Sequence, residues 1–240
     1  MLGYGYGYGY GYYFDPTYIL VIIGAILSIW ASSRVNSAFS KYSRVRSMTG
    51  MTGAQAARRI LDYNGLTNVR IEHVRGNLTD HYDPSSKVLR LSDATFSSGS
   101  VAAIGVAAHE CGHAVQDKES YAPLRIRTAL VPAANLGCKL GIPLVILGLI
   151  LGLNSTLAMI GVWVFAISVL FQIVTLPVEY NASGRALRML QSYNILSEQE
   201  TGMVRKVLNA AALTYVAAAA SSILQLLRLW LIAGGRRRDD

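Results

Sequence analysis

The chain has 240 residues, of which 52% are hydrophobic and 15% are charged, and its mean hydropathy is +0.34. A soluble domain is usually about 25% charged, and the apolar residues here are concentrated in a few long runs. The composition therefore excludes a purely soluble protein and an intrinsically disordered one, and two cysteines exclude a disulfide-stabilised scaffold. The net charge of +8 comes from basic residues that flank the apolar runs, which is typical of a membrane protein and not of a nucleic-acid-binding one.

The N-terminal segment alternates glycine with tyrosine, and we assign residues 1–16 to a low-complexity tail. Residues 17–33 form the first apolar run, with Tyr18 and Trp30 near its ends, where aromatic anchors of a transmembrane helix lie. Basic residues follow this run and none precedes it. The positive-inside rule therefore predicts that the N-terminus lies outside the cell and that residue 34 onward is cytoplasmic.

Residues 34–128 have the mixed polar composition of a small cytoplasmic domain. Thr52 and Gln55 form a capping box that opens a short helix. Alternating hydrophobicity and a turn sequence at residues 83–86 predict a strand followed by a β-hairpin, over residues 68–74, 78–82 and 87–91. A helix is expected over residues 101–116.

Three further apolar stretches follow, at residues 129–153, 156–178 and 211–233. The first two are expected to form a transmembrane hairpin, because only two residues connect them. Residues 179–210 are expected to be a cytoplasmic helical segment and residues 234–240 a basic tail. The last stretch contains Gln225 and Arg228, and a full crossing would place the C-terminal arginines outside the cell. It is therefore expected either to cross the membrane or to lie along it.

The helix predicted over residues 101–116 contains the sequence His109-Glu110-Cys111-Gly112-His113, an HExxH motif. Histidines at positions i and i+4 lie on one helix face, so both can bind one metal ion. Glu110 can then act as general base towards a zinc-bound water, whose pKa zinc lowers to about 7. The alternative is a pair of ordinary surface histidines. The Ala, Gly and Val residues around the motif disfavour it, because a buried His-Glu-His set is costly without a metal. Cys111 is expected to be a core residue without a disulfide.

Two histidines leave a tetrahedral zinc ion one protein ligand short. Glu179, at the cytoplasmic end of the third apolar run, is the carboxylate candidate, and His81 is the next choice. The alternative for Glu179 is an ion pair with Arg185 or Arg188.

Small residues at Ala182 and Ala186 share a helix face with Glu179, and Ala102 and Gly105 share one with the HExxH motif. Small faces of this kind let two helices approach closely. We therefore expect the two helices to pack together closely enough to share a metal.

The chain resembles the YugP-like family of neutral zinc metallopeptidases, which are bacterial membrane proteins. The resemblance runs from about Tyr13 to Leu229 and rests on the segments YFDPTYIL, LTDHYDPSSKVLRLS, AIGVAAHECGHAVQ, YAPLRIRTALVPAAN and LPVEYNASGRAL. More distantly, the chain is similar to HtpX-type and CAAX prenyl proteases, in which an HExxH motif, a transmembrane hairpin and an E-aromatic-x-A-D motif follow in that order. Ser183 stands at the position of that Asp, so the support of the site is expected to differ here.

The resemblance implies Zn2+ bound by His109, His113 and Glu179, with Glu110 as general base. The expected fold is a mainly α membrane protein with three to four transmembrane helices and a small α+β zincin-like cytoplasmic domain, which contains the HExxH helix and a β-hairpin. The hairpin is either a substrate-binding edge or an ordinary part of the sheet. His81 and Tyr82 are candidates for stabilising an oxyanion.

The predicted function is hydrolysis of peptide bonds in protein substrates by a multi-pass zinc metallopeptidase of the gluzincin type, located in the cell membrane with its active site on the cytoplasmic side. The alternative is a membrane scaffold or adaptor with a structural zinc site. Expected partners are protein or peptide substrates and the lipid bilayer, and not nucleic acid. The sequence leaves the substrate identity and the oligomeric state open.

Overall fold

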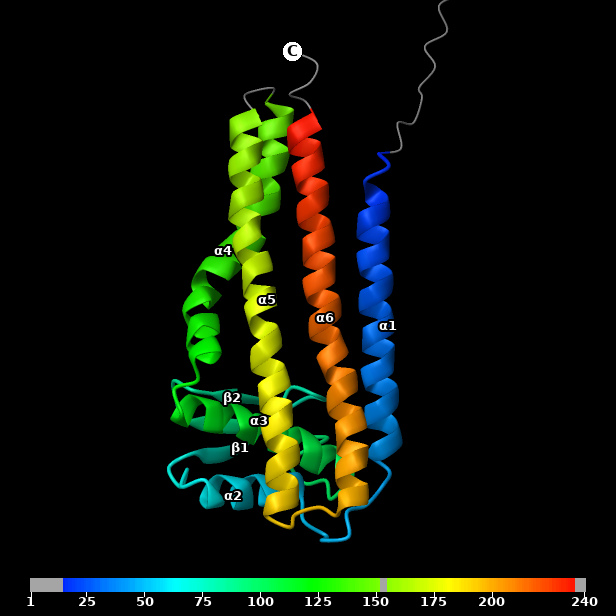
Figure 1. Cartoon of the computed structure of the whole chain (residues 1–240), viewed down its shortest axis with the longest axis vertical. Coiled ribbons are helices and arrows are strands. Elements are labelled where there is room, and N and C mark those ends of the chain that lie inside the picture. Colours follow the sequence, from blue (N-terminus) through cyan, green and yellow to red (C-terminus); the bar gives the residue numbers. More distant parts are fainter. Residues whose placement is uncertain (1–14, 152–154, 236–240) are drawn as a thin grey trace, which may run out of the picture.

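The computed structural model describes residues 15–151 and 155–235. The predicted Gly-Tyr repeat and the arginines at 236–238 lie outside the described residues. The described part contains six helices and three strands (Figure 1): α1 (Tyr18–Tyr42), α2 (Gly53–Tyr63), β1 (Arg70–Val74), β2 (His81–Asp83), β3 (Val88–Ser92), α3 (Val101–Lys118), α4 (Ala122–Ile150), α5 (Ser155–Ser192) and α6 (Glu198–Gly235).

Helices α1, α4, α5 and α6 form a long bundle, and the remaining elements gather around one end of it (Figure 1). Within the described ranges, these four helices are long and apolar enough to cross a membrane, since a crossing takes about 20 residues. The predicted fold class is confirmed: the protein is a mainly α membrane protein with a small α+β domain.

Helix α6 includes the stretch at 211–233 that the sequence leaves doubtful. It continues without a break past Gln225 and Arg228 and runs alongside α1 (Figure 1). The guanidinium of Arg228 lies 4.1 Å from the ring centroid of Tyr18 and 3.6 Å from the carboxylate of Asp15. The charge that argued against a full crossing is therefore partnered at the start of α1.

Helices α5 and α6 also extend beyond the predicted apolar spans. In the segment predicted to be helical at 179–210, residues 179–192 continue α5 and residues 198–210 begin α6. One continuous helix thus connects the apolar span at 156–178 to Glu179. The buried core of the small domain is formed where these extensions meet α2, α3 and the sheet.

The sheet has the strand order β1-β3-β2, with β3 parallel to β1 and antiparallel to β2. The predicted hairpin is present, with Tyr82 opposite Leu89, and the predicted capping box begins α2. The sequence did not indicate the parallel pairing of β1 with β3. Strand β2 lies at the edge of the sheet, over α3.

Helices α3 and α5 pack closely, as the small residues predict, but a different residue of α3 makes the contact. A Cβ atom added to Gly112 would lie 2.6 Å from the backbone oxygen of Ala182. Gly105 instead faces Val204 of α6, and Ala102 packs near Tyr42. The small residues of α3 therefore pack against three helices, α1, α5 and α6, and Gly112 inside the HExxH motif is the residue that allows the close approach of α5.

Candidate active site

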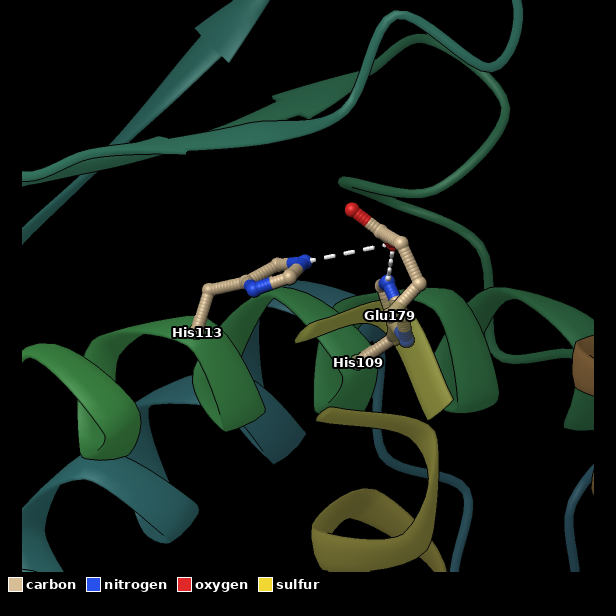
Figure 2. Close-up of side chains that lie close together, drawn as sticks. All are labelled: His109, His113 and Glu179. Carbon is tan, nitrogen blue, oxygen red and sulfur yellow. Dashed lines mark hydrogen bonds and ion pairs between the residues drawn. The ribbon is translucent and has the colours of Figure 1, made fainter. Parts of the chain in front are cut away.

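Helices α3 and α5 bring together the three residues that the sequence predicts as metal ligands. His109 and His113 point from α3 towards the carboxylate of Glu179 on α5 (Figure 2). Oε2 of Glu179 lies 3.2 Å from Nε2 of His109 and 3.6 Å from Nε2 of His113. One ligand atom from each residue lies within 4.8 Å of the others.

Each imidazole is held by a second contact through its other ring nitrogen. Nδ1 of His109 lies 3.1 Å from Oγ of Ser183, and Nδ1 of His113 lies 3.0 Å from Oε1 of Gln116. When Nδ1 carries the ring proton and donates it to these oxygens, Nε2 keeps a free lone pair for a metal. Ser183, which stands where the distant relatives have an Asp, therefore still contacts the first histidine.

Gln116 is a site residue that the sequence reasoning missed. It is fully buried, and its Nε2 donates at 2.9 Å both to the backbone oxygen of Val178 and to Oδ1 of Asn181. It therefore ties His113 on α3 to the α5 segment that carries Glu179. An available signal was a polar residue one helical turn after His113, in the sequence of a helix that is otherwise largely apolar.

Glu179 is 2% exposed and has polar neighbours besides the histidines. Nη1 of Arg127, on α4, lies 3.6 Å from its Oε1. The hydroxyl of Tyr215, on α6, also interacts with the carboxylate. Neither residue was singled out from the sequence, since nothing in the spacing links α4 or α6 to the HExxH motif.

The alternative ion pair of Glu179 with Arg185 or Arg188 is not found among the described residues. Nη2 of Arg185 lies 2.7 Å from the carboxylate of Glu119 instead, and this contact lowers the pKa of Glu119. The cation next to Glu179 is Arg127, at its Oε1, which leaves Oε2 facing the two imidazoles.

Glu110 lies beside this cluster and faces the edge of the sheet. It is 8% exposed, and its Oε2 accepts a hydrogen bond of 3.1 Å from the backbone N–H of Tyr82 on β2. The hydroxyl of Tyr82 points elsewhere and donates to Asp117 at 2.7 Å; burial and this contact raise the pKa of Tyr82. Both oxyanion candidates line a polar cavity; the Tyr82 hydroxyl is bound to Asp117, whereas Nδ1 of His81 lies 2.9 Å from the backbone oxygen of Thr79.

Two cavities meet at the HExxH motif. One, of about 300 Å³, is lined by polar side chains that include His81, His113 and Arg127. The other, of about 240 Å³, lies between α1, α3 and α6 and has a mostly apolar lining. Asp80, Glu110 and Tyr215 line both cavities, so the two cavities adjoin at these residues.

The donor set suits a zinc ion, which binds two imidazole nitrogens and a carboxylate oxygen in open, catalytic sites. Burial disfavours the charged form of His113, but the hydrogen bond to Glu179 and the nearby carboxylates raise its pKa overall. The site thus attracts positive charge where the three ligand atoms converge. Cys111 is a buried free thiol, as expected, and burial raises its pKa, so it is not a ligand candidate.

Comparisons with known proteins identify the family. A family model described as "Putative neutral zinc metallopeptidase" matches residues 17–234. The chain belongs to this family. It is also 47% identical, over 216 residues, to "Putative membrane protease YugP" of Bacillus subtilis (strain 168), and the match covers 90% of this chain and 96% of that protein. No solved structure matches the chain.

The family membership confirms the resemblance inferred from the sequence. The protein is a membrane member of a zinc metallopeptidase family, and its cofactor is Zn2+. The His109, His113 and Glu179 cluster is where the described residues offer a donor set for that ion.

Proposed function

We propose that the protein is an integral-membrane zinc metalloendopeptidase of the gluzincin type that cuts protein substrates at the cytoplasmic face. His109, His113 and Glu179 hold the zinc ion, and Glu110 is the general base. The observation that carries the proposal is the convergence of three ligand atoms within 4.8 Å, with the carboxylate of Glu110 beside them at the edge strand.

Zinc, when bound, supplies a Lewis acid that makes water more acidic and polarises a peptide carbonyl. Glu110 takes a proton from the attacking water and delivers it to the leaving amine nitrogen. The Tyr82 N–H holds the Glu110 carboxylate in place for this transfer. Tyr215 and Arg127, which reach Glu179 and line the polar cavity, are placed to donate to the oxygen that becomes negative. His81, at the rim of that cavity, stays a candidate for the same task.

The free edge of β2 is the proposed site for the substrate backbone. An extended peptide can add to an exposed sheet edge through main-chain hydrogen bonds. The Tyr82 N–H donates to Glu110, so it points away from β3 and marks the side of β2 on which a substrate strand would lie. Edge binding would keep the scissile bond next to Glu110.

The charge distribution supports the proposed cytoplasmic location. Basic residues cluster where α1 enters the small domain, at Arg34, Lys41, Arg44 and Arg46, whereas the sequence before α1 and the sequence that connects α4 to α5 contain no Lys or Arg. The three C-terminal arginines oppose this bias, and the larger cluster outweighs them.

The location is tested by cysteine labelling in intact cells, in a Cys138→Ala background because Cys138 is exposed. Asn154→Cys is expected to react with a membrane-impermeant thiol reagent, and Ser86→Cys only after the cells are opened. Labelling of Ser86→Cys alone in intact cells would place the active site outside.

The function is tested with the purified, zinc-loaded full-length protein and its Glu110→Gln variant. Glu110→Gln is expected to retain stoichiometric zinc and to lose peptide cleavage by orders of magnitude, since it keeps the shape but not the base. The competing function, a scaffold with a structural zinc site, predicts equal behaviour of the two proteins. Zinc-dependent cleavage by both would rule out Glu110 as the base.

A further inference from the structure

The apolar cavity beside the active site is built mainly by helices of the membrane bundle. Its wall residues come from α1, α3 and α6 and from the loop before β2. The apolar wall residues include Val35, Phe39, Leu78, Val106, Leu208 and Ala211. Val35 and Phe39 lie beyond the apolar run that ends at residue 33, so the cavity is on the domain side of the bilayer. A soluble zinc domain alone would lack two of these walls.

The cavity is continuous with the catalytic machinery through α3. Of the first ten residues of α3, all of them described, only Val106 and His109 are not buried, and both line this cavity. They are one helical turn apart, so a group seated against Val106 lies next to the first predicted zinc ligand. Glu110 and Tyr215 form the boundary with the polar cavity.

The loop before β2 presents a leucine to this space at a conformational cost. Leu78 has a φ of 56°, in the left-handed region that non-glycine residues rarely adopt, and its side chain is 40% exposed. Hydrogen bonds hold the loop on both sides: Asp93 accepts from Gly76 N, and Asp80 accepts from Ser92 N. An ordered loop that leaves a leucine exposed at the mouth of an apolar cavity is suited to contact an apolar ligand.

The direction of β2 assigns the cavity to one side of the scissile bond. Leu78 precedes β2 and lines the apolar cavity, Asp80 lines both cavities, and Pro84 follows β2 and lines the polar one. Antiparallel pairing is the commoner and slightly more stable way for two strands to pair. A substrate strand antiparallel to β2 therefore has its N-terminal part in the polar cavity, and the residues after the scissile bond lie in the apolar one.

We propose that this cavity is the subsite for the side chain of the residue immediately after the scissile bond, and that it selects large apolar residues there. The proposal rests on the proposed peptidase function and names the specificity of that same site. Ala211, half-buried on the α6 wall, is the residue that limits the depth of the subsite.

The test uses zinc-loaded full-length enzyme and a mixture of peptides from a digested proteome, with new N-termini read by mass spectrometry. The new N-terminal residue is the one that follows the cut bond. Wild type is expected to enrich Leu, Ile, Met and Phe at this position and to deplete charged residues. Ala211→Phe, which fills the cavity, is expected to lower kcat/KM at least about 10-fold for peptides with Phe or Leu there, relative to peptides with Ala.

Two further variants make the result specific. Val216→Phe adds the same ring to the same helix at an exposed position outside the cavity, and is expected to leave the preference unchanged. Val106→Ala enlarges the cavity without overpacking it, and is expected to raise the Phe-to-Leu ratio of kcat/KM several-fold.

Each failure has its own signature. If wild type cuts no peptide, the proposed function falls and this inference with it. If cleavage depends on Glu110 but shows no apolar enrichment after the bond, or shows it only before the bond, the subsite assignment alone is overturned. An unchanged preference in Ala211→Phe, as expected if the cavity holds a lipid chain instead, would also overturn it.

Discussion

Gly112 and Ala182 are in direct backbone contact: a Cβ atom on Gly112 would lie 2.6 Å from the carbonyl oxygen of Ala182. Gly112 occupies an x position of the HExxH motif, and Ala182 lies one helical turn after Glu179. The closeness of α3 and α5 at this point therefore sets the distance between the two histidines and the carboxylate that faces them.

Gly112→Ala is accordingly expected to push α5 away from α3 and to damage the metal site. Backbone atoms cannot rotate out of the way, so we expect a loss of about 1–3 kcal/mol in stability and a loss of zinc affinity. Gly202→Ala is the control, because an added Cβ there meets nothing within 4 Å, and it is expected to be neutral or slightly stabilising. Thermal unfolding and zinc titration report the two effects. Normal zinc affinity in folded Gly112→Ala would show that the contact does not set the site.

Gln116 is expected to orient His113 and thereby to support metal binding. Gln116→Met keeps the size of the side chain but removes the acceptor for Nδ1 of His113, and should lower zinc affinity about 10- to 100-fold. Gln116→Glu restores the acceptor, although it loses the donor to Val178, and should recover part of the affinity. Equal zinc affinity of the Met and Glu variants would argue that Gln116 only joins the two helices.

Ser183 is expected to play the corresponding part for His109. Ser183→Ala removes the oxygen that lies 3.1 Å from Nδ1 and should lower zinc affinity by about 10-fold or more. Ser183→Asp, which installs the residue of the distantly similar proteases, should bind zinc at least as well as wild type. Competition with a chelator of known affinity measures both. An undisturbed Ser183→Ala protein would show that the serine is dispensable.

The sequence predicted the ligand cluster because local patterns carry that information. The HExxH spacing places His109 and His113 on one helix face, and a transmembrane hairpin must return the chain to the side it left, near Glu179. Arg127 and Tyr215 were missed, because their approach to Glu179 depends on how α4 and α6 pack, which no short motif encodes. The pairing of β1 with β3 was missed for the same reason, since a parallel pair is set by long-range packing and not by a turn.

The turn of the hairpin predicts how the stability of the fold depends on pH. Hydrogen bonds from the hydroxyl of Ser86 and the backbone N–H of Ser85 lower the pKa of Asp83 from 3.8 to about 2. A carboxyl group whose pKa is lower in the folded state than in the unfolded state stabilises the fold at pH values above its unfolded pKa. This contribution is lost as the pH falls from about 3.8 towards 2. Asp83→Asn should therefore lower the Tm at pH 6, and the difference from wild type should disappear by about pH 2. A difference independent of pH would assign the effect to the shape of the turn.

Removal of Glu179 should show whether its carboxylate is a metal ligand or only part of a structural ion pair. Two imidazoles alone bind zinc weakly, so Glu179→Ala should lower both zinc content and peptidase activity, whereas zinc-loaded Glu110→Gln should lose activity only. Arg185→Ala is the matched control on the same helix: it breaks the contact with Glu119 but leaves the cluster intact, and should retain the metal. Circular dichroism establishes that each variant is folded, and metal analysis after gel filtration gives the zinc content.

The buried carboxylate of Glu179 also faces Arg127, so Glu179→Gln serves as a second variant that preserves volume while removing the charge. Folded Glu179→Ala protein that still holds one zinc ion per chain would refute the assignment, and His81, at the rim of the same cavity, would then be the ligand to test.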